Sequence, residues 1–337
     1  MKKSLKQAQS ADDKRRMEKA GLKIRRILVP LDFSGLARQA LNCAVPLARK
    51  YKAKISLVHV VPPALIMAAF PGEGSFLPVN NNDKAFLRSA KLHLDKLAAR
   101  LLPGKLLGRK MVREGNAAFE VVQAAKVLKA DLIVLSTNSR SRLQRAMFGS
   151  TAERIVRHAD CPVLTVRRQT GTSAKQMLLS EKPAYPAGLP WNRILVPLDF
   201  SLSSLRALEA IVTLAQPCGA RLFLLNVIEP NPYSTGMDGS ILVLPDYTMA
   251  RDAKSQLPRI AHHFVPASVP VTPLVLRGRA SSVIVETAAQ NGVDLIVLST
   301  HGHTGLDRLL LGSTAEQVVR HANCPVLVLR KIPKKRN

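Results

Sequence analysis

The chain carries the same pattern of residues twice. The sequence ADLIVLST at residues 130–137 returns as VDLIVLST at residues 293–300, and GSTAERIVRHADCPVLTVRR at 149–168 returns as GSTAEQVVRHANCPVLVLRK at 312–331. The sequence RILVPLDFS also occurs once in each half. The units of solenoid proteins are only about 20–50 residues long. Because the repeat here spans about half of the chain, it indicates a duplicated domain.

Length and composition fit two domains. A chain of 337 residues is longer than the roughly 100–200 residues of one typical domain. We predict a basic N-terminal lead-in at residues 1–24, a first domain at 25–168, a Ser-, Lys- and Pro-rich linker at 169–191 and a second domain at 192–331. No apolar run reaches the about 18 residues of a membrane-spanning helix, and no apolar segment follows the first lysines as in a secretory signal. We therefore expect a cytoplasmic protein.

The net charge of +27 is the outlying feature of the composition, with 50 Lys and Arg against 23 Asp and Glu. Such an excess attracts polyanions through a long-range field. However, the sequence has no helix-turn-helix, RNP-type aromatic pattern or zinc finger that would build a nucleic-acid-binding module. Nucleic acid is therefore expected as a partner only through nonspecific charge attraction.

The four cysteines show no metal-ligand spacing. They are Cys43, Cys161, Cys218 and Cys324. Cys161 and Cys324 are equivalent positions of the repeat, each before a proline at the start of an apolar strand. Buried free thiols are the favoured interpretation, and a bridge between the two halves is the alternative.

Strands and helices are predicted to alternate in each half. Continuous apolar runs such as residues 55–61 are typical of parallel strands covered on both faces. The predicted strands are residues 27–30, 55–61, 111–113, 132–135 and 163–166 in the first half, and 194–197, 222–228, 274–276, 295–298 and 326–329 in the second. This alternation predicts an α/β fold with two doubly wound five-stranded parallel sheets. With strand order 3-2-1-4-5, a ligand would bind beyond the carboxyl ends of the first and fourth strands.

The segment after the first strand carries a candidate ligand-binding carboxylate. Asp199, with Asp32 as its equivalent, can accept hydrogen bonds from ribose hydroxyls or an adenine amino group. The alternative is that Asp-x-Ser is only a helix start, with Ser201 as the cap. The sequence leaves both interpretations open.

The loop after the fourth strand of the second half is rich in small residues. Gly302 lies there between His301 and His303, and small residues let backbone N–H groups approach a phosphate chain closely. A helix that starts at Gly312-Ser313-Thr314 would add the N–H groups of its first turn. The competing interpretation is that Ser313-x-x-Glu316 and Ser150-x-x-Glu153 are capping boxes that close these helices without a ligand.

These residues together resemble the universal stress protein family, over about residues 24–331. ATP-binding members of that family carry a Gly-x2-Gly-x9-Gly-Ser/Thr pattern after the fourth strand. The second domain is similar to this pattern, with Ser299-x2-Gly302-x9-Gly312-Ser313. The first domain departs further, with Ser136-x2-Ser139-x9-Gly149-Ser150, and so loses both leading glycines.

The resemblance implies that the second domain binds ATP, with Mg²⁺ able to accompany the phosphates. The implied nucleotide-binding residues are Pro197, Leu198, Asp199, Val227, Leu298, Ser299, His301, Gly302, His303, Gly312, Ser313 and Thr314. A degenerate second site would comprise Asp32, Val60, Ser136, Ser139, Gly149 and Ser150. The resemblance also implies that the two fifth strands pair within the chain as a pseudo-dimer, which could pair again as a homodimer.

We expect a nucleotide-responsive stress regulator rather than a dedicated enzyme. The sequence has no P-loop lysine, no evident general base and no Mg²⁺-ligand cluster, which argues against rapid ATP hydrolysis. The alternative is an interaction module that binds no nucleotide. A slow ATPase and a nonspecific nucleic-acid binder are less favoured.

Overall fold

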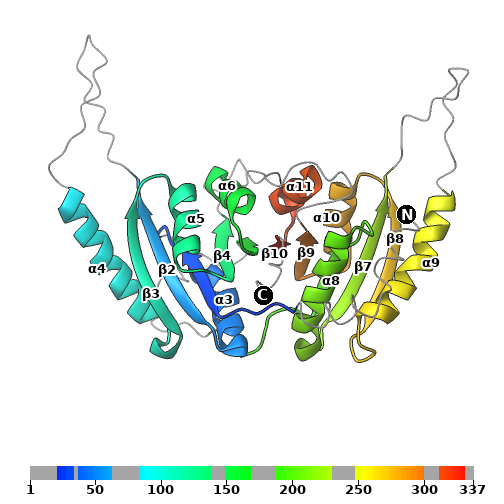
Figure 1. Ribbon diagram of the computed structural model, residues 1–337, viewed down its shortest axis with the longest axis horizontal. Helices are drawn as coiled ribbons and strands as arrows, with labels where there is room; N and C mark the ends of the chain where they lie inside the picture. The colour runs from blue at the N-terminus through cyan, green and yellow to red at the C-terminus, as the bar shows by residue number, and fades with distance from the viewer. Residues whose placement is uncertain are drawn as a thin grey trace, which may run out of the picture. The chain divides into compact units, whose positions relative to one another are not determined.

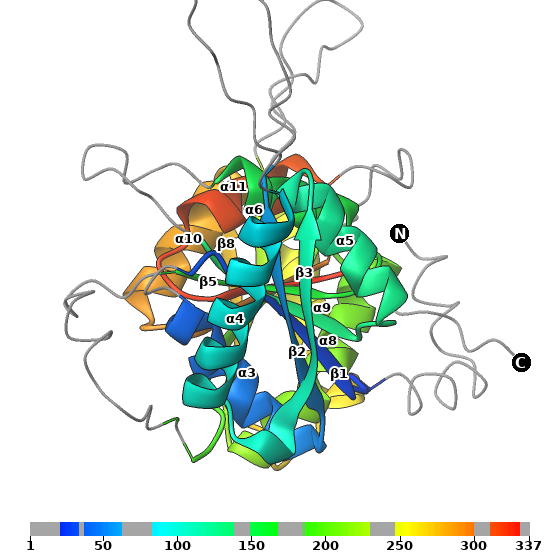
Figure 2. The ribbon, with the colours of Figure 1, turned by 90° about the vertical axis from the view of Figure 1, so that its left-hand side faces the viewer.

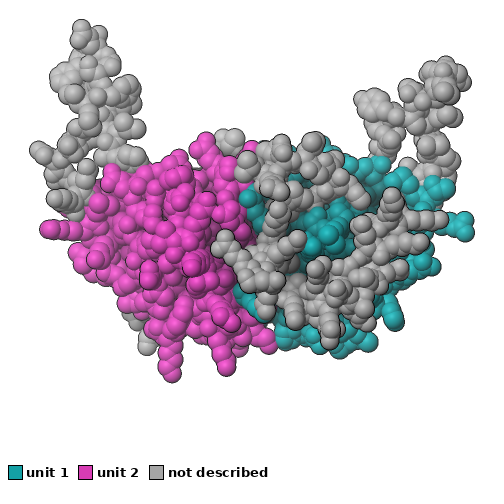
Figure 3. Space-filling model, viewed as in Figure 1, with its two compact units in different colours: residues 1–23, 139–148, 188–337 teal, residues 24–138, 149–187 magenta. Residues whose placement is uncertain are grey.

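The structure, a computed structural model, describes residues 21–33, 37–62, 83–137, 149–167, 185, 187–229, 247–299 and 311–330. The chain divides into two compact units. The first domain lies in the unit of residues 24–138 and 149–187, and the second domain lies in the unit of residues 1–23, 139–148 and 188–337 (Figure 3). The predicted duplication is present as two repeats of one α/β fold.

The first domain is a five-stranded parallel sheet with helices on both faces (Figure 1). Its strands pair in the predicted order β3-β2-β1-β4-β5. Helices α3 and α4 pack on one face, and α5 and α6 pack on the other (Figure 2). In chain order the elements are β1 (Arg26–Pro30), α3 (Ala37–Tyr51), β2 (Lys54–Val61), α4 (Asp83–Leu101), the 3₁₀ turn η1 (Gly104–Leu106), β3 (Leu107–Glu114), α5 (Ala117–Val127), β4 (Leu132–Thr137), α6 (Ser150–His158) and β5 (Val163–Arg167).

The second domain repeats this arrangement. Its strands pair in the order β10-β9-β6-β7-β8, which is the same topology with β6 as the first strand of the repeat. Helices α8 and α9 share one face, and α10 and α11 share the other. The elements are β6 (Arg193–Pro197), α8 (Leu202–Ala215), the 3₁₀ turn η2 (Gln216–Cys218), β7 (Arg221–Ile228), α9 (Tyr247–Phe264), β8 (Val271–Arg277), α10 (Ala280–Gln290), β9 (Leu295–Ser299), α11 (Ser313–His321) and β10 (Val326–Leu329).

The central strands hold the core of each domain. Leu28 in β1 and Ile133 in β4 are completely buried, as are Leu195 in β6 and Ile296 in β9. Helices cover both faces of these strands, so their apolar runs are continuous rather than alternating. Each buried aliphatic side chain stabilises the fold by about 1.5–3 kcal/mol. This packing fixes where the first and fourth strands end.

The third strand of each domain was predicted too short. We predicted residues 111–113 and 274–276, whereas β3 and β8 extend over Leu107–Glu114 and Val271–Arg277. Both strands lie at the end of their sheet's strand order and are only partly buried. Their sequences therefore lack a long apolar run, and the backbone pairing with β2 and β7 defines their length.

The cysteines are free thiols, as the favoured interpretation predicted. Cys43 is buried, and burial raises the pKa of its thiol to about 12. Cys161, Cys218 and Cys324 are partly exposed rather than buried. The alternative, a bridge between the two halves, is not formed.

None of the helices in the described part of the chain combines the length and the apolar character that a membrane crossing requires.

Candidate functional site

The first and fourth strands of each repeat are neighbours, as the site prediction required. In the second domain Ile194 of β6 pairs with Leu295 of β9, and Leu195 pairs with Ile296, in parallel. The carboxyl ends of β6 and β9 therefore leave the sheet side by side. Because α11 follows β9 and leads back to the parallel strand β10, its N-terminus lies at this same edge.

The structure brings most of the predicted residues of the second domain to this edge. Pro197, Asp199, Val227 and Ser299 are partly exposed there, and Gly312 and Ser313 are exposed. The side chains of two predicted residues, Leu198 and Leu298, are buried in the core. His301, Gly302 and His303 lie outside the described residues.

Helix α11 begins one residue earlier than a capping box with Ser313 as its N-cap requires. Its N-cap is Gly312, which has no side chain to cap the helix, and Ser313 is the first helical residue. The N–H of Glu316 donates to the carbonyl oxygen of Gly312 at 3.0 Å. The N–H groups of Ser313, Thr314 and Ala315 therefore precede the first hydrogen bond of the helix, and they point toward the sheet edge that carries the site.

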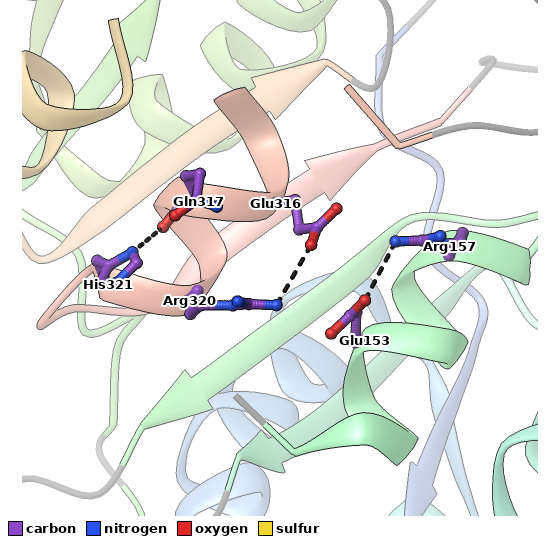
Figure 4. A network of polar contacts seen from close by, with 6 residues as sticks. All are labelled: Glu153, Arg157, Glu316, Gln317, Arg320 and His321. Atoms are coloured by element: carbon purple, nitrogen blue, oxygen red, sulfur yellow. Dashed lines mark hydrogen bonds and ion pairs between the residues drawn. The ribbon is translucent and has the colours of Figure 1, made fainter. Parts of the chain in front are cut away.

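The glutamate of the expected capping box binds an arginine instead. Arg320 donates through Nη2 to Oε1 of Glu316 at 3.3 Å, one helical turn away (Figure 4). Helix α6 repeats the arrangement: Gly149 is the N-cap, and Arg157 donates to Glu153 at 3.1 Å. The capping-box interpretation is therefore wrong for both helices. The carboxylates of Glu153 and Glu316 pair with arginines one turn further along their helices, and such pairs stabilise a helix.

Asp199 belongs to the start of helix α8. Its Oδ1 accepts hydrogen bonds from the backbone N–H of Ser201 at 3.0 Å and from the Ser201 hydroxyl at 2.6 Å. Ser201 in turn caps α8, because its Oγ accepts from the N–H of Ser204 at 3.2 Å. Ser201 is thus the cap of α8, as the helix-start interpretation predicted for the second domain. The carboxylate is held in a fixed orientation at the candidate site, and a ligand contact by Asp199 stays a prediction.

A left-handed backbone position follows this aspartate in both domains. Phe200 has φ 60° and Phe33 has φ 58°. An aromatic residue in this region is strained, at a cost of about 1–3 kcal/mol. The strain occurs at the same position of both repeats, where the chain turns from the end of the first strand toward the next helix.

Two polar residues that the sequence analysis missed hold the chain just beyond the first strand. Asn226 of β7 is buried and donates from Nδ2 to the carbonyl oxygen of Leu198 at 2.7 Å. At the equivalent position of β2, His59 donates from Nδ1 to the carbonyl oxygen of Leu31 at 2.8 Å. The available signal was a polar residue inside each apolar second strand, directly before Val60 and Val227.

The first domain has a stack of rings at the corresponding edge. The Phe33 ring stacks on the His59 ring with centroids 3.8 Å apart and on the His93 ring of α4 with centroids 4.5 Å apart. This stack lies at the carboxyl ends of β1 and β2, beside the predicted residues Asp32 and Val60. In the second domain, Asn226 takes the position of His59. The two sites therefore differ at the strand ends as well as in the loop after the fourth strand.

The other residues of the degenerate site are divided between the end of β4 and the start of α6. Ser136 is partly exposed in β4, while Gly149 and Ser150 form the start of α6. Ser139 lies outside the described residues. Within the described ranges, no group of three or more His, Cys, Asp or Glu side chains could hold a metal ion.

Comparison with known proteins gives a consistent result for both halves. The sequence model described as the Universal stress protein family matches residues 23–167 and 190–330. A universal stress protein of Methanocaldococcus jannaschii is 33% identical over 146 residues, which cover 43% of this chain and 85% of that protein. Universal stress protein A homolog 1 of Coxiella burnetii is 32% identical over 142 residues, covering 41% and 96%.

A solved structure matches nearly the whole chain. The crystal structure of a universal stress protein from Archaeoglobus fulgidus covers 92% of this chain and 98% of its own, with a TM-score of 0.63. The sequence identity is 17%, so this match describes the fold alone.

Proposed function

The chain belongs to the universal stress protein family, and from this premise we propose that its second domain binds ATP and that the protein acts as a nucleotide-responsive stress regulator. One observation carries the proposal. Helix α11 has a glycine N-cap, so the N–H groups of Ser313, Thr314 and Ala315 have no capping side chain before them. Such N–H groups, together with the helix dipole, form an anion-binding site.

The neighbouring strand ends support the binding of a nucleoside beside the phosphates. Asp199 is held by Ser201 at the edge where α11 begins, and its carboxylate can accept hydrogen bonds from ribose hydroxyls. Pro197 and Val227 are partly exposed at the same edge and offer apolar contact to a base. In this arrangement Gly302 lets the preceding loop approach the phosphates, and Mg²⁺ accompanies them without a dedicated protein site.

The first domain is proposed to bind ATP much more weakly or not at all. Ser139 replaces the glycine that Gly302 supplies in the second domain, and a side chain there limits the approach of the backbone. The first domain also has a stack of three rings, Phe33, His59 and His93, at the end of its second strand. The second domain has Asn226 in place of His59. One competent and one degenerate site per chain is therefore the proposed arrangement.

A matched pair of substitutions tests the assignment of the site. Gly302→Arg is expected to weaken ATP binding by at least about tenfold, or about 1.4 kcal/mol, because its side chain would occupy the space of the phosphates. Ser139→Arg changes the equivalent position of the first domain and is expected to leave binding unchanged. Equilibrium dialysis with radiolabelled ATP measures both affinities. Loss of binding in Ser139→Arg but not in Gly302→Arg would show that the nucleotide site lies in the first domain and that the proposed assignment is wrong.

A further inference from the structure

The amino ends of the strands in the first domain form a strongly basic edge. Helices run against the strands, so the last turns of α3, α4 and α5 lie at the edge where β2, β3 and β4 begin. The strand β3 points upward in Figure 2, and this is the lower edge of the domain. The exposed basic residues there, called the basic edge below, are Arg25, Arg26, Arg49, Lys50, Lys52, Lys54, Arg100, Lys105, Lys126 and Lys129.

Acidic residues balance little of this charge. Asp131 accepts hydrogen bonds from the backbone N–H groups of Arg25 and Arg26, both at 2.9 Å, and forms an ion pair with the Arg26 side chain at 3.4 Å. Asp160 pairs with Lys126 at 3.4 Å. Among the described residues at this edge, these two carboxylates face ten basic side chains.

The second domain does not share the basic edge. The motifs of the duplication align the two domains residue by residue along these segments. Arg26 and Lys54 keep a basic equivalent in Arg193 and Arg221. Five other basic residues have uncharged equivalents in the second domain: Arg49, Lys50, Lys52, Lys126 and Lys129 correspond to Gln216, Pro217, Gly219, Ala289 and Gly292. The charge is therefore a property of one repeat and not of the fold.

Two of these lysines stand where the backbone favours glycine. Lys52 has φ 52° and Lys129 has φ 49°, while the equivalent Gly219 and Gly292 have φ 64° and φ 56°. Each lysine follows a helix end and adopts the left-handed conformation that closes it, a conformation in which side chains other than those of Gly and Asn are uncommon.

The helix ends themselves are the same in both domains. After Lys52 the N–H of Ala53 donates to the carbonyl oxygen of Ala48 at 2.8 Å, and after Gly219 the N–H of Ala220 donates to that of Ala215 at 3.1 Å. Lys129 and Gly292 are followed by equivalent bonds of 2.8 and 2.9 Å. The lysines thus add strain and charge but no backbone hydrogen bond that glycine lacks. Strain retained at a surface position points to a function for the side chain.

We propose that the basic edge binds the phosphate backbone of a nucleic acid without sequence preference. Neighbouring strands lie about 4.8 Å apart, so the starts of β3, β2, β1 and β4 spread the charges over a line of roughly 15 Å. A nucleic-acid strand carries one charge per about 3.4 Å of helix axis, and several phosphates fit along this line. Contacts to phosphates position a nucleic acid without discriminating between bases.

The distribution of apolar side chains favours nucleic acid over a lipid surface. Binding to a bilayer gains from apolar side chains inserted beside the charges. Of the large exposed apolar side chains described in this domain, Phe86 and Phe119 lie in the first turns of α4 and α5, at the opposite edge. Val127 is the one beside the basic edge. The basic edge is also opposite to the carboxyl edge at which a nucleotide would bind, so this binding is separate from that of ATP.

The test replaces the two strained lysines with the glycines of the second domain. Lys52→Gly with Lys129→Gly removes two charges and relieves the backbone, so the fold is retained. Fluorescence anisotropy of a labelled random-sequence duplex of DNA and of a labelled single strand, over a series of salt concentrations, measures binding by the full chain. We expect affinity to fall by about tenfold or more at low salt, and the slope of log K against log salt to decrease by about 2.

A control variant distinguishes nucleic-acid binding at the basic edge from general attraction by the net charge of the protein. Arg251→Ala with Lys254→Ala removes the same charge from exposed positions of α9 in the second domain, and it is expected to change affinity little. Equal losses in both variants would overturn the proposal, as would the absence of binding by the wild-type chain at low salt. Binding to phosphatidylserine vesicles without binding to the duplex would also overturn it, in favour of a lipid surface. ATP affinity, measured on the same variants, is expected to stay constant.

Discussion

Single polar side chains inside the domains hold backbone segments or titrate outside their ordinary range. Asn226 and His59 each bind a backbone carbonyl oxygen just beyond the first strand, and so hold the segment that leads to Asp199 or Asp32. Glu209 of α8 is a different case. Both of its carboxylate oxygens are buried, and neither has a hydrogen-bond partner among the residues that the structure describes. Burial raises the pKa of Glu209 from its ordinary value of 4.5 to about 7, and the charge of Arg206 offsets part of this effect.

The raised pKa of Glu209 predicts a pH-dependent stability. The folded chain keeps the proton at pH values where the unfolded chain releases it, so stability falls as the pH rises from about 4.5 through about 7. Glu209→Gln, which cannot ionise, is expected to raise the melting temperature at pH 8 and to change it little at pH 4.

The first domain carries a neutral residue, Asn42, at the position equivalent to Glu209. Glu286→Gln, at an exposed position of α10, makes the same substitution at the protein surface and serves as the control. Thermal unfolding followed by circular dichroism makes the comparison. If Glu209→Gln raised the melting temperature equally at pH 4 and pH 8, ionisation of Glu209 would not be the cause of the effect.

At the scale of the elements, the two kinds of helix start in the second domain should respond differently to mutation. Ser201 caps α8 through its side chain, whereas Ser313 is the first helical residue of α11 behind a glycine cap. Ser201→Ala is therefore expected to destabilise the protein by about 1 kcal/mol. Ser313→Ala is expected to stay within about 0.5 kcal/mol, as for a surface substitution.

Urea unfolding of the two variants beside the wild type measures both effects. Equal destabilisation by Ser201→Ala and Ser313→Ala would mean that Ser313 contributes a cap after all, and that the start of α11 is closed without a ligand.

The order of the elements could be predicted from the sequence, while the ends and contacts of several elements could not. The repeated motifs and the alternation of apolar strands with helices were sufficient for the duplication and for the doubly wound parallel fold, because both depend on local patterns. The strand order 3-2-1-4-5 depends on pairing between distant segments; it entered the site prediction as a condition, and the pairing within each domain confirms it. The partly exposed strands β3 and β8 lack such a pattern, and their lengths come from pairing with a neighbouring strand.

The candidate site shows the same division. Asp199, Gly312 and Ser313 were found from their motifs, but the shift of the helix start by one residue was not, because Ser-x-x-Glu fits a cap and a first turn equally well. The bond from Asn226 to Leu198 joins residues 28 positions apart. The positive φ of Lys52 and Lys129 was also outside the reach of the sequence, because only the glycines at the equivalent positions hint at it.

For the whole molecule, the family resemblance predicts that the fifth strands of the two domains, β5 and β10, pair within the chain. Edge strands with buried apolar residues such as Val163–Arg167 and Val326–Leu329 would otherwise invite pairing with other chains. A protease site inserted into the linker, followed by cleavage and gel filtration, tests this prediction. We expect the two cleaved halves to elute together at the size of the intact chain, and separate elution would contradict the pairing.

The central claim is that one chain binds one ATP, in its second domain. Calorimetric titration with ATP and Mg²⁺ tests it most directly, on protein first shown by its absorbance ratio to be free of copurified nucleotide. Two temperatures are used, because the heat of binding changes with temperature and cannot vanish at both. We predict one site per chain, lost in Gly302→Arg and retained in Ser139→Arg. Two equal sites, or no heat at either temperature, would contradict the account.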